Sequence, residues 1–493
     1  MYEDLDTSHG LSPDILPFLV AGAFGEDGRD RDAYLRVKSL LADRGGLIVT
    51  GDGALTTDSG ELAQDSTREP GDAASSLRVA KSVSRPFYLY AVLANSLFQR
   101  GVFVLYLGHQ GFSAAQIALL QTLLYIVSAL AEVPTGFIAD RVGRRASIVI
   151  GQALIGACLI GQVALSGYGA FVVLFALQGI GMACVSGAET ALLYDLLRLR
   201  GAETHYVKVK SRYATFGATT MALAIALGGS LQQVSWELVY LTSACALLLA
   251  AAVLLTRVPE IRGEDVAALD EPGGADDEAG ASPGPAGSPE QAGASLGKAA
   301  VSRRLAPRLA SLVVVSALMH ATMTPYFIFT QETLSHQGMA TALVSVVMSA
   351  GYLIGGFAPL LADRADRRLG VHLLVPLTLL VLVAALGFTS LGLVWLTVGV
   401  FLLAVGVPDV TAVVVDNVFN ESVPSRYRAS LLSVITFVES LLIGCGYLVL
   451  GWLVDRAGPT HGLAWYALVP ALALALSVPA LRKGTWVKGE KTG

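Results

Sequence analysis

The sequence has little charge for its length. Of its 493 residues only 15% are charged and 54% are hydrophobic, whereas a soluble globular protein usually carries about 25% charged residues. The charges are concentrated in residues 1–85 and 257–308 and in a few short segments between apolar runs. Many of these runs are about 20 residues long, which matches a hydrocarbon core roughly 30 Å thick. The scarcity of charge excludes a soluble protein and predicts an all-α polytopic membrane protein.

Cysteine is also scarce, and several catalytic patterns are missing. The four cysteines lie in apolar runs without the paired spacing of a disulfide framework or a metal site. The phosphate-binding pattern G-x-x-x-x-G-K-[ST] is absent, as is a nucleophile paired with a base. We therefore expect neither an enzyme nor a directly ATP-driven pump, and no cofactor, metal or nucleic acid. Residues 1–15 carry four acidic residues and no basic residue, so no cleavable signal peptide is expected.

Twelve apolar runs are predicted to cross the membrane. They cover residues 87–107, 114–138, 147–166, 169–195, 212–233, 236–256, 309–333, 340–361, 370–389, 392–418, 429–453 and 461–481. Nearly all of the 34 Lys and Arg residues lie in the tails or in alternate loops. Two arginines depart from this rule, Arg100 inside the first run and Arg456 in the last outer loop. The positive-inside rule then places both termini in the cytoplasm.

Polar segments divide the chain. Residues 258–308 are rich in Ala, Gly, Pro and acidic residues, have too little apolar surface to fold, and are predicted to be a disordered cytoplasmic linker. They separate an N-terminal six-helix bundle at 85–257 from a C-terminal six-helix bundle at 309–482. Residues 483–493 are predicted to be a cytoplasmic tail. Residues 1–84 are a polar cytoplasmic extension, read as a disordered or weakly folded tail, with a small regulatory module or a start codon further downstream as alternatives.

The two predicted bundles resemble each other. The stretch "ADRVGRR" at 139–145 and the stretch "ADRADRR" at 362–368 each follow the second span of their half. Similarly, "SRYA" at 211–214 and "SRYR" at 425–428 each precede the fifth span. Two motifs in the same order and in equivalent places indicate a duplicated six-helix unit. Parallel repeats of this kind are a transporter architecture, with the substrate site near the midplane between them.

The stretch "GFIADRVGRR" resembles the G-x-x-x-D-R-x-G-R-R signature of the major facilitator superfamily, which lies between its second and third helices. The matching residues are Gly136, Asp140, Arg141, Gly143, Arg144 and Arg145. The resemblance covers about residues 85–482 and implies a twelve-helix transporter, similar to a bacterial, exporter-like branch. It also implies that this loop locks the two halves in the outward-open state, with the aspartate meeting the eleventh helix near Ala429. Positive-inside topology alone is the simpler explanation of the arginines.

Chemistry suggests how this motif works. Gly136 would let a neighbouring helix approach closely, and Asp140 would cap the third helix or face the positive end of another helix. The second copy of the motif has Pro359 and Asp366 at the glycine positions, so a symmetric lock is not expected. Its charged members are Asp363, Arg364, Arg367 and Arg368. A family stretch tied to proton coupling also recurs in the fourth span, but with Phe175 in place of the expected arginine.

Ionisable groups inside membrane spans are expensive and therefore candidates for function. A rise of about 1.5 Å per residue places Arg100, His320 and Glu439 near the midplane, at the depth of the family's central cavity. A buried arginine needs an anion, so Arg100 is expected to pair with Glu439 or with an anionic substrate. A static ion pair, a snorkelling arginine and a satisfied core histidine are the alternatives. The polar residues assigned to the substrate cavity, which would serve equally well as contacts between helices, are Asn95, Gln99 and Gln178.

Three carboxylates, Glu132, Glu189 and Asp409, fall in the inner third of their spans and are predicted to carry the coupling proton. Desolvation disfavours the charged form of such a group, so it can take up a proton near neutral pH. The alternatives are a structural role and, for Glu132, a partner of the basic loop below it. Asp195 and Asp416 lie closer to the cytoplasm and are expected to pair with arginines of the inner gate, namely Arg212, Arg426 or Arg428.

The sequence favours a monomeric secondary transporter of the bacterial plasma membrane. It would move a small organic molecule across the lipid bilayer by alternating access, most simply by proton-coupled efflux. An importer of an anionic metabolite, with Arg100 as the anion anchor, is one alternative. A membrane sensor or scaffold that does not transport, with the N-terminal extension as its output, is another.

Overall fold

The computed structural model describes residues 47–49, 55–57, 70–261, 306–423 and 425–480. The chain divides into two compact units, Met1–Ser76 and Leu77–Gly493. In the first unit, β1 (Leu47–Val49) pairs antiparallel with β2 (Leu55–Thr57), so that Leu47 lies opposite Thr57. The rest of the predicted extension up to residue 69, most of the predicted linker 258–308, and the tail 483–493 lie outside the described residues.

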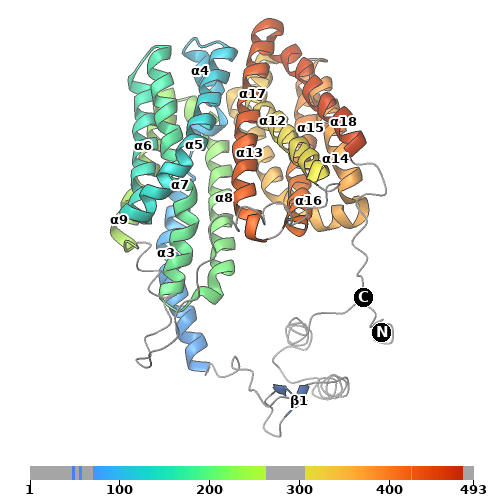
Figure 1. Ribbon diagram of the computed structural model, residues 1–493. Helices are drawn as coiled ribbons and strands as arrows, with labels where there is room; N and C mark the ends of the chain where they lie inside the picture. Colours follow the sequence, from blue (N-terminus) through green and yellow to red (C-terminus); the bar gives the residue numbers. More distant parts are fainter. Residues whose placement is uncertain (1–46, 50–54, 58–69, 262–305, 424, 481–493) are drawn as a thin grey trace, which may run out of the picture. The chain divides into compact units, whose positions relative to one another are not determined.

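The second unit is helical (Figure 1). Its first half contains α3 (Pro70–Ala94), η1 (Phe98–Gly101), α4 (Phe103–His109), α5 (Ala114–Val142), α6 (Arg144–Ala164), α7 (Tyr168–Leu199), η2 (Glu203–His205), α8 (Tyr206–Gln232) and α9 (Trp236–Arg257). Its second half contains α12 (Ala306–His336), α13 (Thr341–Phe357), η3 (Ala358–Leu361), α14 (Ala362–Thr389), α15 (Val394–Val405), α16 (Val407–Ser422), α17 (Ser425–Tyr466) and α18 (Leu468–Ala480).

Nine helical stretches of the described residues are long and apolar enough to cross a membrane. Two of them, 341–389 and 434–477, are 49 and 44 residues long and contain the bends at Gly370 and Gly458. Each therefore holds more than one straight helix. The first predicted span is not among the nine, because its helix is interrupted. These stretches are consistent with the twelve predicted spans and with a multi-pass membrane protein.

The first predicted span, 87–107, is broken, which the sequence prediction missed. Side chains of Asn95 and Ser96 bond the carbonyls four residues earlier and compete with the helical backbone, so α3 ends at Ala94. A short 3-10 turn, η1, and the helix α4 follow. The freed backbone groups find partners on other helices, since Phe98 N–H donates to Ser243 Oγ at 3.0 Å. Irregular backbone is tolerated inside a membrane protein only where neighbours satisfy it in this way.

The tenth predicted span, 392–418, is also divided. It forms α15 and α16, which meet at Gly406 with Pro408 in the first turn of α16. Proline lacks an N–H and is best tolerated at the start of a helix. The division therefore falls where the sequence can accept it.

Two sides of the helical unit are distinguished by their loops. The "basic side" carries the loops around 143, 199–206 and 357–362, near which many lysines and arginines lie. The "opposite side" carries the loops around 110–113, 165–167, 233–235, 337–340 and 390–393.

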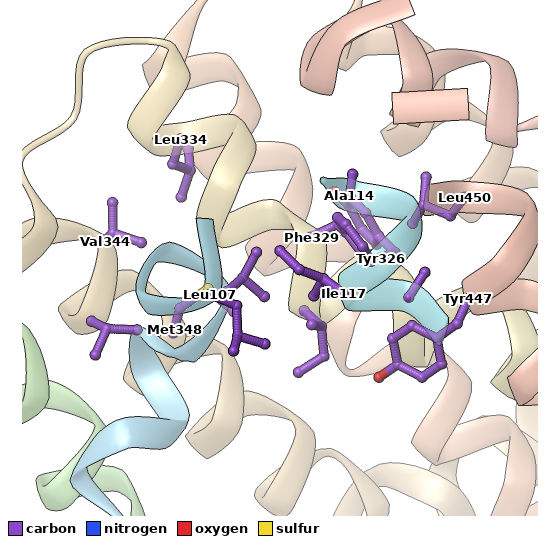
Figure 2. Packing of buried hydrophobic residues seen from close by; sticks show 14 of the residues in the cluster. Leu107, Ala114, Ile117, Tyr326, Phe329, Leu334, Val344, Met348, Tyr447 and Leu450 are labelled. Atoms are coloured by element: carbon purple, nitrogen blue, oxygen red, sulfur yellow. The ribbon is translucent and has the colours of Figure 1, made fainter. Parts of the chain in front are cut away.

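The two halves are packed together on the opposite side. One continuous apolar cluster there contains residues from both halves. Figure 2 shows Leu107, Ala114 and Ile117 of the first half lying against side chains of α12, α13 and α17. The second-half members labelled there are Tyr326, Phe329, Leu334, Val344, Met348, Tyr447 and Leu450.

On the basic side, by contrast, each half has a cluster of its own. One cluster includes Phe87, Tyr90, Leu192 and Leu254 of the first half, and all its members lie within that half. The other includes Val375 and lies wholly within the second half. A shared core on one side and separate cores on the other mean that the halves are joined on the opposite side and stand apart on the basic side.

Two pairs of long helices make most of the contacts between the halves. α5 packs along α17, and α8 packs along α13. In the second pair, Ser345 Oγ bonds the Ala226 carbonyl at 3.0 Å and accepts the Gly229 N–H at 3.2 Å. A Cβ atom at Gly229 would lie only 2.4 Å from Ser345 Oγ, so glycine allows this approach.

Candidate functional site

The predicted gating motif forms the turn between α5 and α6. α5 ends at Val142, and Gly143 has φ 119°, a conformation that favours glycine. A Cβ atom at Gly143 would also lie 2.3 Å from a carboxylate oxygen of Glu260. The motif glycine is therefore required both by the backbone conformation and by the packing of the segment that follows α9.

The carboxylate at the start of α6 belongs to Glu260. It accepts the backbone N–H groups of Arg145 and Ala146 at 2.9 and 3.1 Å. Asp140 was one predicted cap for this helix, and Glu260 caps two of its N–H groups. The side chain of Asp140 lies outside the described part of the chain, so its predicted capping role and its predicted contact with the eleventh helix both stay predictions.

The motif arginines have three different environments. Arg141 is exposed and stacks on the Phe137 ring at 4.1 Å. Arg144 forms an ion pair with Asp195 at the end of α7. Arg145 donates to the Val258 carbonyl at 2.8 Å and contacts Glu260 at 3.2 Å, where it binds the C-terminal end of α9. The motif thus ties together α6, α7 and α9 of its own half.

One further expectation about this motif is corrected, and one stays a prediction. Asp195 pairs with Arg144 rather than with Arg212, Arg426 or Arg428, because the start of α6 lies beside the end of α7. Gly136 has no atom of another helix within 4 Å of a Cβ position. It is exposed because the halves stand apart on this side, so no neighbouring helix approaches it here.

The second copy of the motif lies on the surface. Asp363, Arg364, Arg367 and Arg368 are all exposed. Their short helix is set off from the rest of α14 by Gly370, with φ 63°. The first copy turns three residues after its aspartate, whereas this copy turns seven residues after it. The two loops therefore differ in shape, as the replaced glycines predicted.

A cavity of about 610 Å³ lies above the motif on the basic side. It is lined by α5 and α7, by Arg144 at the start of α6, and by Val434 and Phe437 of α17, so it lies between the halves. Glu132 and Gly136 are among its α5 residues. Glu132 is exposed and forms no ion pair with a basic residue of the described ranges. That position favours contact with water or solute over bracing the basic loop.

His320 and Glu439 are brought together. The His320 Nδ1 atom lies 2.5 Å from Glu439 Oε1, and each side chain is about one quarter exposed, 25% and 27%. The geometry at Nδ1 is not that of a hydrogen bond, so the contact is a close charge–charge contact between α12 and α17. Asp409 and Asp416 of α16 act on His320 electrostatically. The contact between His320 and Glu439 is therefore surrounded by further negative charge from the same half.

Arg100 does not pair with Glu439, which corrects one of the two predicted pairings. Glu439 contacts His320 instead, because these two residues face each other across α12 and α17. Arg100 lies on η1 and is exposed. Its positive charge interacts with the hydroxyl groups of Tyr125 and Tyr447. In the described ranges it forms no ion pair with an acidic side chain. The second predicted partner, an anionic substrate, stays a prediction.

The predicted polar lining residues mostly bond within the protein. Asn95 donates to the Ala91 carbonyl at 2.8 Å. Gln178 accepts from Gln162 at 3.1 Å, between α6 and α7, which matches the interhelical alternative. Gln99 is buried, and its Oε1 atom has no hydrogen-bond partner in the described ranges. Gln99 therefore presents a buried polar atom that no residue of the described ranges satisfies.

Glu189 belongs to a polar chain inside the first half. It accepts a hydrogen bond from the Tyr213 hydroxyl. Tyr213 stacks on Tyr90 with ring centroids 6.5 Å apart, and the Tyr90 hydroxyl accepts from Gln152 at 2.7 Å. Lys210 also acts on Glu189 electrostatically. Asp409 lies on the other half, with a carboxylate oxygen 2.9 Å from a Cβ position at Gly355.

Sequence reasoning missed three residues on the opposite side. Gln331 is completely buried; its amide donates to the Arg100 carbonyl at 3.1 Å and accepts the Val104 N–H at 3.4 Å. Glu332 has a buried carboxylate oxygen without a partner in the described ranges. Asp455 binds the start of α5. The repeat of the gating pattern around Asp455 was the available signal, whereas the contacts of Gln331 depend on the break in the first span.

Comparison with known proteins places the chain among transporters. A family model described as Major Facilitator Superfamily matches residues 88–446. No curated protein sequence matches the chain. Solved structures match over most of their length, which establishes the fold. The nucleoside transporter NupG is 16% identical, with a TM-score of 0.62 over 82% of this chain and 100% of that one.

Two further structures extend the comparison. A bacterial homologue of the human lysosomal transporter Spinster, inward-facing and occupied, is 14% identical, with a TM-score of 0.62 over 82% of this chain and 96% of that one. A D-xylose–proton symporter is 16% identical, with a TM-score of 0.57 over 82% and 97% of the two chains. All three are transporters and none is an enzyme.

Proposed function

Because this chain belongs to the Major Facilitator Superfamily, we propose that it is a secondary active transporter that moves a small organic solute by alternating access. It would have twelve membrane spans in two six-helix bundles. The observation that carries the proposal is the arrangement of the halves. They share one apolar core on the opposite side and enclose a cavity of about 610 Å³ on the basic side.

The basic side is assigned to the cytoplasm. Lysines and arginines gather in the loops of that side, and such loops stay in the cytoplasm. With this orientation the structure corresponds to an inward-open state, both termini are cytoplasmic, and the protein acts as a monomer in the bacterial plasma membrane.

Proton-coupled efflux is the proposed direction and drive. Glu132 faces the cavity, and Glu189 and Asp409 lie one in each half with only partial exposure. Proton uptake at such carboxylates would change the charge between the halves. Arg100, His320 and Glu439 would hold the solute. The lock at Asp140 would close the basic side when the solute leaves on the other side.

Import of an anionic metabolite is the second candidate, and Arg100 favours it. Its guanidinium is exposed, acts on two tyrosines between the halves, and has no acidic partner in the described ranges. A carboxylate or phosphate on a solute would supply the missing charge.

The test uses everted membrane vesicles that contain the full chain, with a pH gradient imposed or collapsed. Proton movement would be followed with a pH-sensitive dye while a panel of organic cations, organic anions, a nucleoside and D-xylose is added. Solute-dependent proton release supports coupled efflux, and solute movement without a proton signal contradicts coupling. The matched control is Glu237→Gln, which removes an exposed acid at the start of α9.

The same vesicles separate the two candidates. Efflux predicts solute accumulation in everted vesicles, whereas import predicts accumulation in right-side-out vesicles. A preference for anionic members of the panel that disappears in Arg100→Gln would favour import of an anion.

A further inference from the structure

The gating pattern of residues 136–143 occurs once more with both glycines intact, just before the bend of α17 at Gly458. The sequence "GWLVDRAG" at 451–458 has the spacing G-x-x-x-D-R-x-G of "GFIADRVG" at 136–143. The corresponding residues are Gly451, Asp455, Arg456 and Gly458. This copy lies on the opposite side of the protein from the first.

The copy at 136–143 and the copy at 451–458 have the same local structure. Arg456 stacks on Trp452 at 5.1 Å, as Arg141 stacks on Phe137 at 4.1 Å, and in each case the ring lies four residues earlier. Gly458 turns the chain with φ 80°, as Gly143 does with φ 119°. The shared spacing therefore encodes one structural unit, which ends a long helix with a stacked arginine and a glycine turn.

The copy on α17 is engaged with the other half. The Asp455 carboxylate accepts the backbone N–H groups of Ala114 and Ala115 at 2.8 and 3.0 Å, and the Ser113 hydroxyl at 2.8 Å. These groups form the start of α5, where N–H groups have no partner within the helix and the helix dipole favours an anion. Hydrogen bonds to an ionised carboxylate are stronger than neutral ones.

Gly451 allows α17 to lie close against the start of α5, whereas the corresponding Gly136 of α5 is not covered by another helix. A Cβ atom at Gly451 would lie 2.4 Å from the Ala118 Cβ and 2.7 Å from the Ala114 carbonyl oxygen. At Gly136 nothing lies within 4 Å. The same glycine is therefore covered by the partner helix in one copy and open to the cavity in the other.

We propose that α5 and α17 carry a reciprocal pair of latches. The two helices run antiparallel, because Asp455 contacts Ala114 at the start of α5 and Gly444 contacts Thr122 further along it. The pattern on α17 therefore lies at the start of α5, and the pattern on α5 lies toward the start of α17. The "opposite-side latch", formed by Asp455 and the start of α5, holds the present state, and the motif at Asp140 holds the reverse state. Only one latch is closed at a time. This inference rests on the proposed alternating access.

The test measures the opening of the opposite side directly. Spin labels would be placed at Gln233→Cys and Ser390→Cys, exposed positions on that side in the two halves, in a full chain lacking its four native cysteines. Pulsed electron–electron double resonance in lipid nanodiscs gives the distance between the labels. We expect a mainly short distance in the parent protein. In Asp455→Ala the ratio of long to short distances should rise roughly tenfold, since charge-assisted hydrogen bonds are lost.

Three further variants sharpen the test. Asp455→Asn keeps one acceptor and should give a smaller shift in the same direction. Glu237→Gln removes a negative charge on the same side without touching α5 and should leave the distances unchanged. Adding Asp140→Asn to Asp455→Ala should return the ratio toward the parent value, because it weakens the reverse state.

Unchanged distances in both Asp455 variants would overturn the latch, and so would an equal shift in Glu237→Gln. Asp455→Asn settles the question if the alanine variant does not fold. Solute transport by the parent protein is measured separately. If the parent protein transports a solute but the Asp455 variants show no change in distance, the latch is wrong and the proposed function stands. If the distances change but the parent protein transports no solute, the proposed function is wrong and the latch contact stands.

Discussion

At the scale of single residues, charge is used in two ways. The motif arginines and Glu260 bond helices of one half to each other, through Arg144 to α7 and through Arg145 to α9. His320 and Glu439, in contrast, form a pair that is about one quarter exposed, and the charges of Asp409 and Asp416 also act on His320. The first group makes each half rigid, and the second places adjustable charge between the halves.

Glu439 gives the residue-scale prediction for solute binding. Replacing it by glutamine keeps the shape but removes the charge that faces His320 at 2.5 Å. We expect the affinity for the solute found in the vesicle screen to fall about tenfold or more, the effect of losing one charged hydrogen bond. Isothermal titration calorimetry on purified protein measures it, with Ser440→Ala as the control. An unchanged affinity would make Glu439 a packing residue.

Gln331 gives a prediction about stability. Its amide satisfies the Arg100 carbonyl and the Val104 N–H at the break of the first span and is completely buried. Gln331→Leu leaves both backbone groups without a partner, so the free energy of unfolding should fall by about 2–5 kcal/mol. Thermal unfolding in detergent should show a lower Tm. The exposed Gln233→Leu should leave the Tm unchanged, and equal Tm values for both variants would contradict the role of Gln331.

At the scale of elements, the sequence predicted the apolar helices well because length and apolarity are local properties. It could not predict the break between α3 and α4, since the freed Phe98 N–H and Arg100 carbonyl are satisfied by Ser243 and Gln331 on distant helices. The pairing of Glu439 with His320 was missed for a related reason. Depth can be counted along a helix, but the rotation that turns one side chain toward another is set by packing.

The turn between α5 and α6 supports a prediction at this scale. Gly143 has φ 119°, and an added Cβ would lie 2.3 Å from Glu260. Gly143→Ala should therefore combine backbone strain with displacement of Glu260 from the start of α6, and destabilise the protein by about 2–4 kcal/mol. The control is Gly167→Ala, which has φ 90° but nothing within 4 Å and should show the strain alone. Equal losses of Tm would show that Glu260 contributes nothing.

At the scale of the whole molecule, the contacts between halves are unevenly distributed. On the opposite side, glycines and small hydroxyl residues let α5 approach α17 and α8 approach α13. Thr122 Oγ1, for example, donates to the Gly444 carbonyl at 2.9 Å. On the basic side, Val434 and Phe437 face a cavity instead. Alternating access requires the α5–α17 and α8–α13 contacts on the opposite side to separate together. Forcing either pair of helices apart should therefore favour the state that is open on the opposite side.

Gly229 tests this coupling away from the latch. Gly229→Val would place side-chain atoms against Ser345 Oγ, 2.4 Å from a Cβ position, and against the Thr341 carbonyl at 2.5 Å. Wedging α8 from α13 should also open the α5–α17 interface. A Thr122→Cys probe, only 5% exposed in the parent residue, should then react about tenfold faster with a membrane-impermeant maleimide, because the closed state is disfavoured by at least 1.4 kcal/mol. Gly399→Val, with nothing within 4 Å, is the matched control. Equal rates in the two variants would mean that the helix pairs separate independently and that the halves do not move as rigid units.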